Sequence, residues 1–257
     1  MMLAVEDLAF GYGARTVGAE VSFSLQAGEV LCLLGPNGGG KTTLFKTLLG
    51  LLPAKAGRIR LDGADLSRWP RARVARAIAY VPQAHAAFFP FTVREVVLMG
   101  RAARLKPFAG PGRADAEAAE AALATLGIGH LAERIYTEIS GGERQMALIA
   151  RALAGEPRIL VMDEPTASLD FGNQTRVLEQ VRRLSATGIA VVLSTHDPGH
   201  AFLCADRVAL LHGGRLVALG RPEDTITPAI LARVYGVAVA VVPLPGHGRS
   251  VCTPILA

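Results

Sequence analysis

A glycine-rich segment, GPNGGGKTT at residues 35–43, constrains the fold of this chain more than any other feature. It fits the pattern G-x-x-x-x-G-K-[ST], in which glycines let backbone N–H groups turn inward around an anion. An apolar run at residues 30–34 comes directly before it, and an apolar helix is predicted over residues 44–52. The segment therefore predicts an α/β fold with a polyphosphate-binding loop between a buried strand and a helix. A chance glycine-rich turn is the alternative.

Two residues of this loop have distinct predicted roles. Lys41 is predicted to reach the β- and γ-phosphates, and the hydroxyl of Thr42 is predicted to ligate Mg²⁺. The full set of predicted phosphate-binding residues is Gly35, Pro36, Asn37, Gly38, Gly39, Gly40, Lys41, Thr42 and Thr43.

An acidic pair ends another apolar run, at residues 159–162. An acidic residue at the end of a buried strand beside the loop can hold Mg²⁺ through water, and Asp163 is assigned this role. Glu164 follows it and is predicted to polarise the attacking water as a base. Such a pair is otherwise often a solvated turn or a helix cap, but the apolar strand before it favours the catalytic interpretation.

The rest of the chain suggests one sheet wrapped by helices. Further apolar runs lie at residues 78–81, 190–194 and 208–211, and helical stretches separate most of them, which favours a parallel sheet. The first sixty or so residues instead alternate short β-type segments with turns. Residues 93–155 are mostly helical and are predicted to form an inserted subdomain. The last fifteen residues, 243–257, contain three prolines and are predicted to be an irregular tail.

Composition narrows the location and the partners. No run approaches the ~18 apolar residues of a membrane-spanning helix, and the N-terminus lacks the basic start of a signal peptide. The three cysteines form no CxxC pair, which fits a reducing compartment. The net charge of +5 is interpreted as a solvated surface, because the arginines at residues 68–76 have no interleaved aromatics beyond Trp69. We therefore expect no nucleic-acid partner.

A second glycine motif makes the identification more specific. ISGGERQ at residues 139–145 resembles the signature of ABC ATPases, which is usually LSGGQ. Ser140, Gly141 and Gly142 would present a hydroxyl and bare amides at the start of a helix over residues 144–154. In that family, this surface binds the γ-phosphate held by the other protomer. An ordinary capped helix is the competing interpretation.

The remaining motifs of the family occur in its order along the chain. Tyr12 resembles the aromatic residue that stacks on adenine, although a core tyrosine is the alternative. Gln83 in YVPQ resembles the glutamine that senses Mg²⁺ and the γ-phosphate. Asp170 in SLD resembles the loop that crosses the dimer interface, and His196 in LSTHD resembles the switch histidine that contacts the γ-phosphate. A lone histidine at a strand end would otherwise carry little weight.

The resemblance implies a P-loop NTPase fold of the ABC ATPase type. Its parts would be a central, mostly parallel sheet, an N-terminal antiparallel β subdomain and the inserted helical subdomain, all in one domain over residues 1–242. It also implies an ATPase that uses ATP and Mg²⁺ and closes as a dimer with a second copy of itself. Such a dimer would power integral membrane permease subunits from the cytoplasmic face of the inner membrane, as a peripheral protein.

Two segments point to partners and to a subfamily. From Ala84 to Phe91 the chain reads AHAAFFPF, an apolar loop that could dock on the permease, or could be a local core of the helical subdomain. The segments at residues 89–101 and 226–237 resemble ATPases of metal-chelate importers. Those carry ferric siderophores, haem, cobalamin or, in relatives, molybdate, and a periplasmic binding protein would act indirectly.

Other function classes fit the sequence less well. A soluble ABC-type ATPase of DNA repair or maintenance would carry long heptads or cysteine clusters, and a translation factor would carry two phosphate loops. An exporter would usually be fused to membrane helices. A nucleotide sensor without turnover is disfavoured by the presence of both Glu164 and His196.

Overall fold

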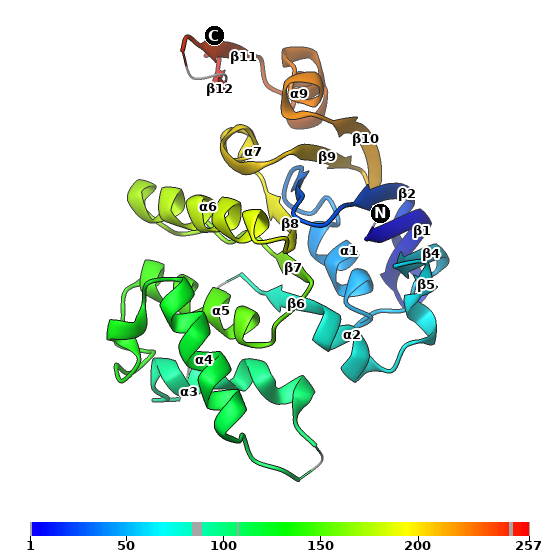
Figure 1. Ribbon diagram of the computed structural model, residues 1–257. Helices are drawn as coiled ribbons and strands as arrows, with labels where there is room; N and C mark the ends of the chain where they lie inside the picture. Colours follow the sequence, from blue (N-terminus) through cyan, green and yellow to red (C-terminus); the bar gives the residue numbers. More distant parts are fainter. Residues whose placement is uncertain (1, 84–88, 107, 247–248, 257) are drawn as a thin grey trace.

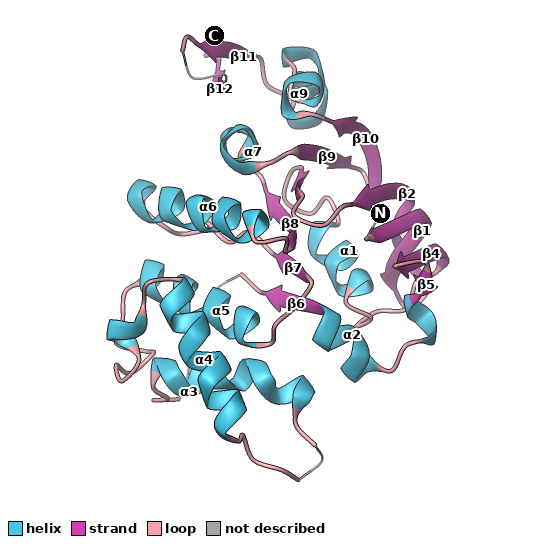
Figure 2. Ribbon diagram, viewed as in Figure 1, coloured by secondary structure: helices cyan, strands magenta, loops and turns pink. Residues whose placement is uncertain are grey.

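The computed structural model describes residues 2–83, 89–106, 108–246 and 249–256, and its centre is a six-stranded sheet (Figure 1, Figure 2). Five neighbouring strands run parallel, and β10 pairs antiparallel with β9 at one edge. This confirms the predicted mostly parallel sheet. In spatial order the strands are β10 (Arg215–Gly220), β9 (Arg207–His212), β3 (Val30–Leu34), β8 (Ala190–Thr195), β7 (Ile159–Met162) and β6 (Ile78–Val81).

Strand β3, which leads into the phosphate-binding loop, is buried on both faces. Its alternate side chains enter two different cores, because successive residues of a strand point to opposite sides of a sheet. Val30, Cys32 and Leu34 belong to one core, and Leu31 and Leu33 belong to the other. A strand covered on both faces needs an apolar residue at every position, which explains why this run is continuous and does not alternate.

The N-terminal strands form a separate antiparallel sheet, as predicted. Helix α1 (Lys41–Leu48) packs against it, because Leu44, Phe45 and Leu48 share a core with residues of both sheets. This helix begins at Lys41 instead of residue 44, since Gly40 of the phosphate-binding loop is its N-cap. In spatial order the strands are β2 (Arg15–Leu25), β1 (Leu3–Tyr12), β4 (Ala56–Leu61) and β5 (Ala64–Asp65).

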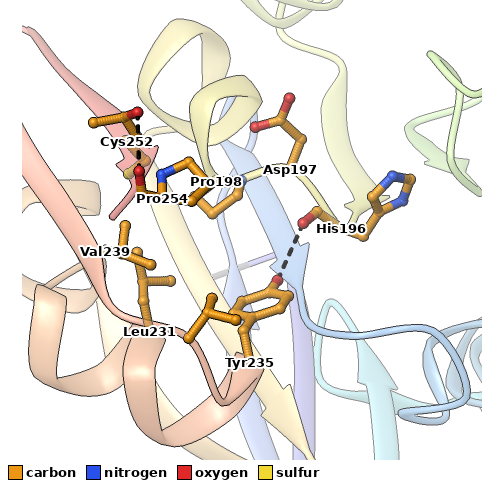
Figure 3. A pocket seen from close by; sticks show the side chains of 10 residues that line it. His196, Asp197, Pro198, Leu231, Tyr235, Val239, Cys252 and Pro254 are labelled. Carbon is orange, nitrogen blue, oxygen red and sulfur yellow. Dashed lines mark hydrogen bonds between the residues drawn. The ribbon is translucent and has the colours of Figure 1, made fainter. Parts of the chain in front are cut away.

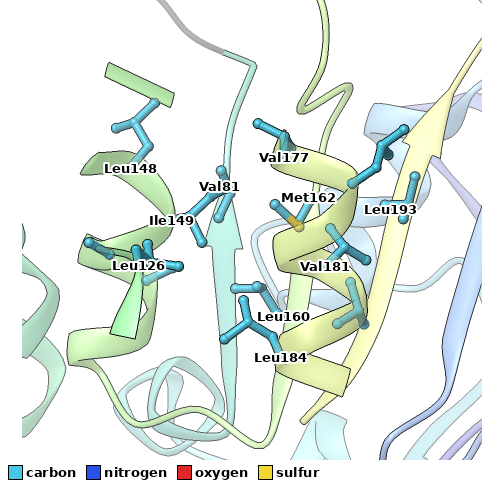
Figure 4. Close-up of a cluster of buried hydrophobic side chains, with 14 of the residues drawn as sticks. Val81, Leu126, Leu148, Ile149, Leu160, Met162, Val177, Val181, Leu184 and Leu193 are labelled. Atoms are coloured by element: carbon cyan, nitrogen blue, oxygen red, sulfur yellow. The ribbon is translucent and has the colours of Figure 1, made fainter. Parts of the chain in front are cut away.

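Helices cover the face of the central sheet that is opposite the N-terminal sheet and α1. The helices α5 (Gly141–Ala154), α6 (Phe171–Ala186) and α7 (Pro198–Cys204) contribute buried side chains to the core on this side. Figure 4 shows part of this core, where strand residues Val81, Leu160, Met162 and Leu193 lie with Leu148 and Ile149 of α5 and with Val177, Val181 and Leu184 of α6.

Residues 93–154 are mostly helical, in agreement with the sequence, and their helices cluster below the sheet in Figure 1. The limits of an inserted subdomain, and of one domain over residues 1–242, stay predictions. The cluster comprises α3 (Val93–Leu98), η2 (Met99–Arg104), α4 (Arg113–Thr125), η3 (Gly129–Leu131) and α5. The shorter elements elsewhere are η1 (Leu66–Arg68), α2 (Arg71–Ala77), α8 (Pro222–Thr225) and α9 (Pro228–Tyr235).

Arg101 joins the parts of this helical cluster. Its buried guanidinium donates to Asp115 Oδ1, to Glu156 Oε2 and to the carbonyl oxygen of Ala154, each at 2.8 Å. We expect Arg101→Met to lower the thermal unfolding midpoint by about 5 °C, because hydrogen bonds to charged groups are lost from a buried position. The control Arg113→Met, which breaks an exposed pair with Glu117, should lower it by less than about 1 °C. If thermal melts gave Arg101→Met and Arg113→Met the same unfolding midpoint, this role of Arg101 would be contradicted.

The prediction of an irregular C-terminal tail is wrong. Strands β11 (Val239–Leu244) and β12 (Arg249–Pro254) pair as an antiparallel hairpin, with Pro243 opposite Ser250. The prolines suggested irregular structure because a proline has no N–H to donate to a neighbouring strand. In a two-stranded sheet both strands are edges, and edge strands tolerate proline.

Candidate functional site

The phosphate-binding loop follows β3 and turns directly into α1. Gly38 and Gly40 have φ values of 78° and 99°, in the left-handed region that favours glycine. Lys41 is 5% exposed, and its Nζ donates to the carbonyl oxygens of Gly35 at 2.8 Å and Pro36 at 3.1 Å. The turn therefore places one buried ammonium beside a helix N-terminus, which is an arrangement that favours a polyanion.

A cleft of about 430 Å³ lies beside this loop and brings most of the predicted site together. Tyr12 lines it and is 45% exposed, which excludes the alternative of a core tyrosine. Gly35 and Pro36 do not line the cleft, and their carbonyl groups instead hold Lys41. The predicted residues that do line it are Tyr12, Asn37, Gly38, Gly39, Gly40, Lys41, Thr42, Thr43, Gln83, Asp163 and Glu164.

The cleft also contains Arg15 and Val17, which no motif predicted. Arg15 lies directly opposite Tyr12 across the β1–β2 hairpin. The sequence between them, Gly13 and Ala14, is a two-residue hairpin turn, and recognising it would have placed Arg15 beside Tyr12. A second cation is thereby added to a cleft that already contains Lys41.

Asp163 is buried and is held from two neighbouring strands. Its Oδ1 accepts a hydrogen bond from Ser194 Oγ at 2.7 Å, and its Oδ2 accepts one from the Tyr80 hydroxyl at 3.3 Å. Burial, together with the charge of Asp163, raises the pKa of Tyr80, so its hydroxyl remains a donor at neutral pH. Ser194 Oγ also accepts from the main-chain N–H of Glu164 at 2.9 Å. Ser194 and Tyr80 thus fix the acidic pair.

Glu164 connects the loop to the predicted switch histidine. Its Oε1 lies 3.4 Å from Lys41 Nζ, and its Oε2 lies 3.2 Å from His196 Nδ1. Its φ of 46° is in the left-handed region, a strained conformation for a residue with a Cβ, and such strain is often found at functional sites. The carboxylate is only 15% exposed. It can therefore act as a base toward a water in the cleft.

The signature residues and Asp170 lie outside the cleft. Ser140 caps α5: its Oγ accepts from the N–H of Glu143 at 3.3 Å, and Glu143 Oε2 accepts from the N–H of Ser140 at 2.8 Å. Glu143, which stands where the family usually has glutamine, thus completes a capping box. Asp170 caps α6 through the N–H of Asn173 at 2.9 Å. Neither these caps nor Gly141 and Gly142 line the cleft.

Known proteins resemble this chain over most of its length. The sequence profile of the ABC transporter family matches residues 19–167. An uncharacterized ABC transporter ATP-binding protein of Haemophilus influenzae is 46% identical over 91% of this chain and 89% of its own length. The hemin import ATP-binding protein HmuV of Pseudomonas entomophila is 43% identical over 96% of this chain and 98% of its own length.

A solved structure gives the same result. A transporter described as an inward-facing ABC transporter of metal-chelate type has a TM-score of 0.87 and 32% identity, and the match covers 99% of this chain and 98% of that one. Within the described residues, no helix has both the length and the apolar composition needed to cross a membrane. The matches do not support the alternative of a non-transport ATPase of DNA repair. The chain therefore belongs to the ABC transporter family, as an ATP-binding subunit whose ATP hydrolysis is coupled to transport.

Proposed function

We propose that this subunit hydrolyses Mg²⁺-bound ATP in the cleft and thereby powers the import of a metal chelate through a membrane permease. The convergence of Lys41, Asp163 and Glu164 on one cleft carries the proposal, because it provides a phosphate-binding charge, a metal ligand and a base. The relatives named for hemin import and the neighbour of metal-chelate type support this class of cargo. Ferric siderophores, haem and cobalamin belong to it, and hemin has the most direct support.

The residues of the cleft fit a bound magnesium ion. Mg²⁺ prefers oxygen ligands, and the Thr42 hydroxyl, the Gln83 amide and the Asp163 carboxylate supply them within one cleft. When bound, the ion would neutralise charge on the phosphates. Toward the nucleotide itself, Tyr12 would stack on the adenine, and the loop amides and Lys41 would hold the phosphates. Glu164 would polarise the attacking water, and His196 would contact the γ-phosphate.

A second copy of the chain would complete each site. Ser140, Gly141, Gly142 and Asp170 do not line the cleft of their own chain, so their predicted role toward ATP requires another protomer. ATP bound on one cleft would contact the signature of the partner only in the closed dimer. ATP would favour the closed dimer because it makes additional contacts in that state, and hydrolysis of the ATP would let the dimer reopen.

The permease would dock on the apolar loop after Gln83. Residues 84–88 of this loop lie outside the described residues, but Phe89 and Phe91 are 66% and 41% exposed, with ring centroids 5.9 Å apart. We expect Phe89→Ala with Phe91→Ala to abolish chelate transport while ATP binding stays native, because neither ring lines the cleft. Copurification with the permease measures docking, and nucleotide titration measures ATP binding. Native transport by this double variant would rule out the docking surface.

Reconstitution tests the proposed function directly. The chain would be tagged and expressed with the permease that copurifies from membranes, and the complex placed in vesicles with its periplasmic binding protein. We expect ATP-dependent uptake of hemin, with ferric siderophore and cobalamin as comparison cargoes and Glu164→Gln as the inactive control. Binding of the subunit at the cytoplasmic face of the membrane should depend on the permease. If the complex hydrolysed ATP but took up none of these chelates, the proposed class of cargo would be refuted.

A further inference from the structure

The C-terminal part of the chain contacts the candidate site through a hydrogen bond (Figure 3). Tyr235, the last residue of α9, donates its hydroxyl hydrogen to the main-chain carbonyl oxygen of His196 at 3.2 Å. Both residues lie outside residues 19–167, the part that matches the family profile. None of the catalytic motifs in the sequence includes Tyr235.

This hydrogen bond acts on His196, whose side chain contacts the candidate base Glu164. His196 Nδ1 lies 3.2 Å from Glu164 Oε2, yet the histidine side chain is 54% exposed. His196 also lies in the turn between β8 and α7, and so it lies outside the hydrogen-bonded strands of the sheet. A hydrogen bond to its carbonyl oxygen limits rotation of that peptide group, and so limits the direction in which the imidazole points.

The helix that carries Tyr235 is firmly anchored. Leu231 and Val234 are buried in the core of the central sheet, and Thr227 caps the first turn of α9 through the N–H of Ile230 at 3.3 Å. Burial raises the pKa of the Tyr235 phenol above its ordinary value. The hydroxyl therefore keeps its proton at neutral pH and remains a donor.

A cavity of about 330 Å³ borders Tyr235 on the side of the C-terminal hairpin. In Figure 3 its walls include Pro198 of α7, Leu231 of α9, and Val239 and Cys252 of the hairpin. Packing therefore does not enclose the Tyr235 ring on every side. The hydrogen bond from its hydroxyl to His196 thus contributes more to the orientation of the ring than it would for a fully enclosed ring. We propose that Tyr235 is a positioning residue, which holds the His196 peptide so that the imidazole stays directed toward Glu164. This inference rests on the proposed role of His196 in hydrolysis.

The full-length Tyr235→Phe variant tests the inference, because it keeps the ring and removes only the hydroxyl group. We expect kcat for ATP to fall about fivefold, with an unchanged KM, since Tyr235 does not line the nucleotide cleft. In a His196→Ala background the same substitution should leave the residual single-turnover rate unchanged, because a residue that acts through another adds nothing once that residue is gone. Val239→Ala is the matched control: it borders the same cavity and should keep the native kcat.

Three results would overturn the inference. These are a native kcat in Tyr235→Phe, an equal fold-loss in the His196→Ala background, or a matching loss in Val239→Ala accompanied by a lower unfolding midpoint in both variants. The His196→Ala variant alone separates this inference from the proposed function. Native turnover there would refute the role of His196 itself, whereas low turnover there with native turnover in Tyr235→Phe would refute only the role of Tyr235.

Discussion

The Glu164→Gln variant is expected to bind ATP with native affinity and to hydrolyse it at least about a hundredfold more slowly, as the loss of a positioned base implies. Glutamine has nearly the same shape as glutamate and can still bond to Lys41 and His196, which both contact this carboxylate. The strained backbone at this position remains as it is. The substitution therefore removes a negative charge and a proton acceptor while leaving the cleft intact.

Because hydrolysis is what reopens the dimer in the proposed cycle, this variant should also accumulate as an ATP-bound dimer. Size-exclusion chromatography with and without ATP measures the dimer, and release of phosphate measures turnover. Glu117→Gln is the matched control, since Glu117 is exposed and forms an ion pair with Arg113 on the surface of α4. Turnover close to native in Glu164→Gln would mean that another group serves as the base.

The Gly142→Ala variant is expected to weaken ATP-dependent dimerisation at least about tenfold, while a single chain keeps its affinity for the nucleotide. A Cβ atom at Gly142 would lie 2.4 Å from Cγ of Asn173 and nearly as close to its amide atoms. Asn173 would have to move, and its Nδ2 is hydrogen-bonded to Asp170 Oδ2 at 2.6 Å. One methyl group would thus disturb both the signature and the residue predicted to cross the dimer interface.

The same structure offers a compensating change. Asn173→Ala removes all three atoms that the new Cβ would meet, and its main-chain N–H can still donate to Asp170. We therefore expect the double variant Gly142→Ala with Asn173→Ala to recover much of the dimerisation. Analytical ultracentrifugation in the Glu164→Gln background, where ATP is consumed only slowly, would measure both variants. A defect that persists in the double variant would show that the methyl group disturbs the partner chain directly and not through Asn173.

The sequence predicted the main features of the site because each motif lies at a fixed point of a strand or helix. Parallel strands end at the same edge of a sheet, so Gln83 after β6, Asp163 after β7 and the loop after β3 meet at one cleft. The supporting residues were not predicted, since their roles depend on which strands are neighbours. Ser194 can reach Asp163 only because β7 and β8 are paired with Met162 beside Leu193. A sequence without known strand order does not contain that information.

The C-terminal segment shows a different reason for a missed feature. In the sequence its prolines favour irregular structure, whereas a hairpin of two edge strands tolerates them. The contact from Tyr235 to His196 was missed for a related reason. It joins residues 39 positions apart through a side-chain hydroxyl and a main-chain carbonyl, and a carbonyl group is present at every residue and has no sequence signal.

The separation of the signature from the cleft of its own chain has a genetic consequence. In the proposed dimer, each ATP site draws on two copies of the gene product, so a defective copy can inactivate a site whose other half is intact. Alleles of this gene that dimerise but cannot hydrolyse ATP are therefore expected to be dominant over a normal copy in the same cell. Alleles that cannot dimerise at all are expected to be recessive, because their products leave the normal chains free to pair with one another.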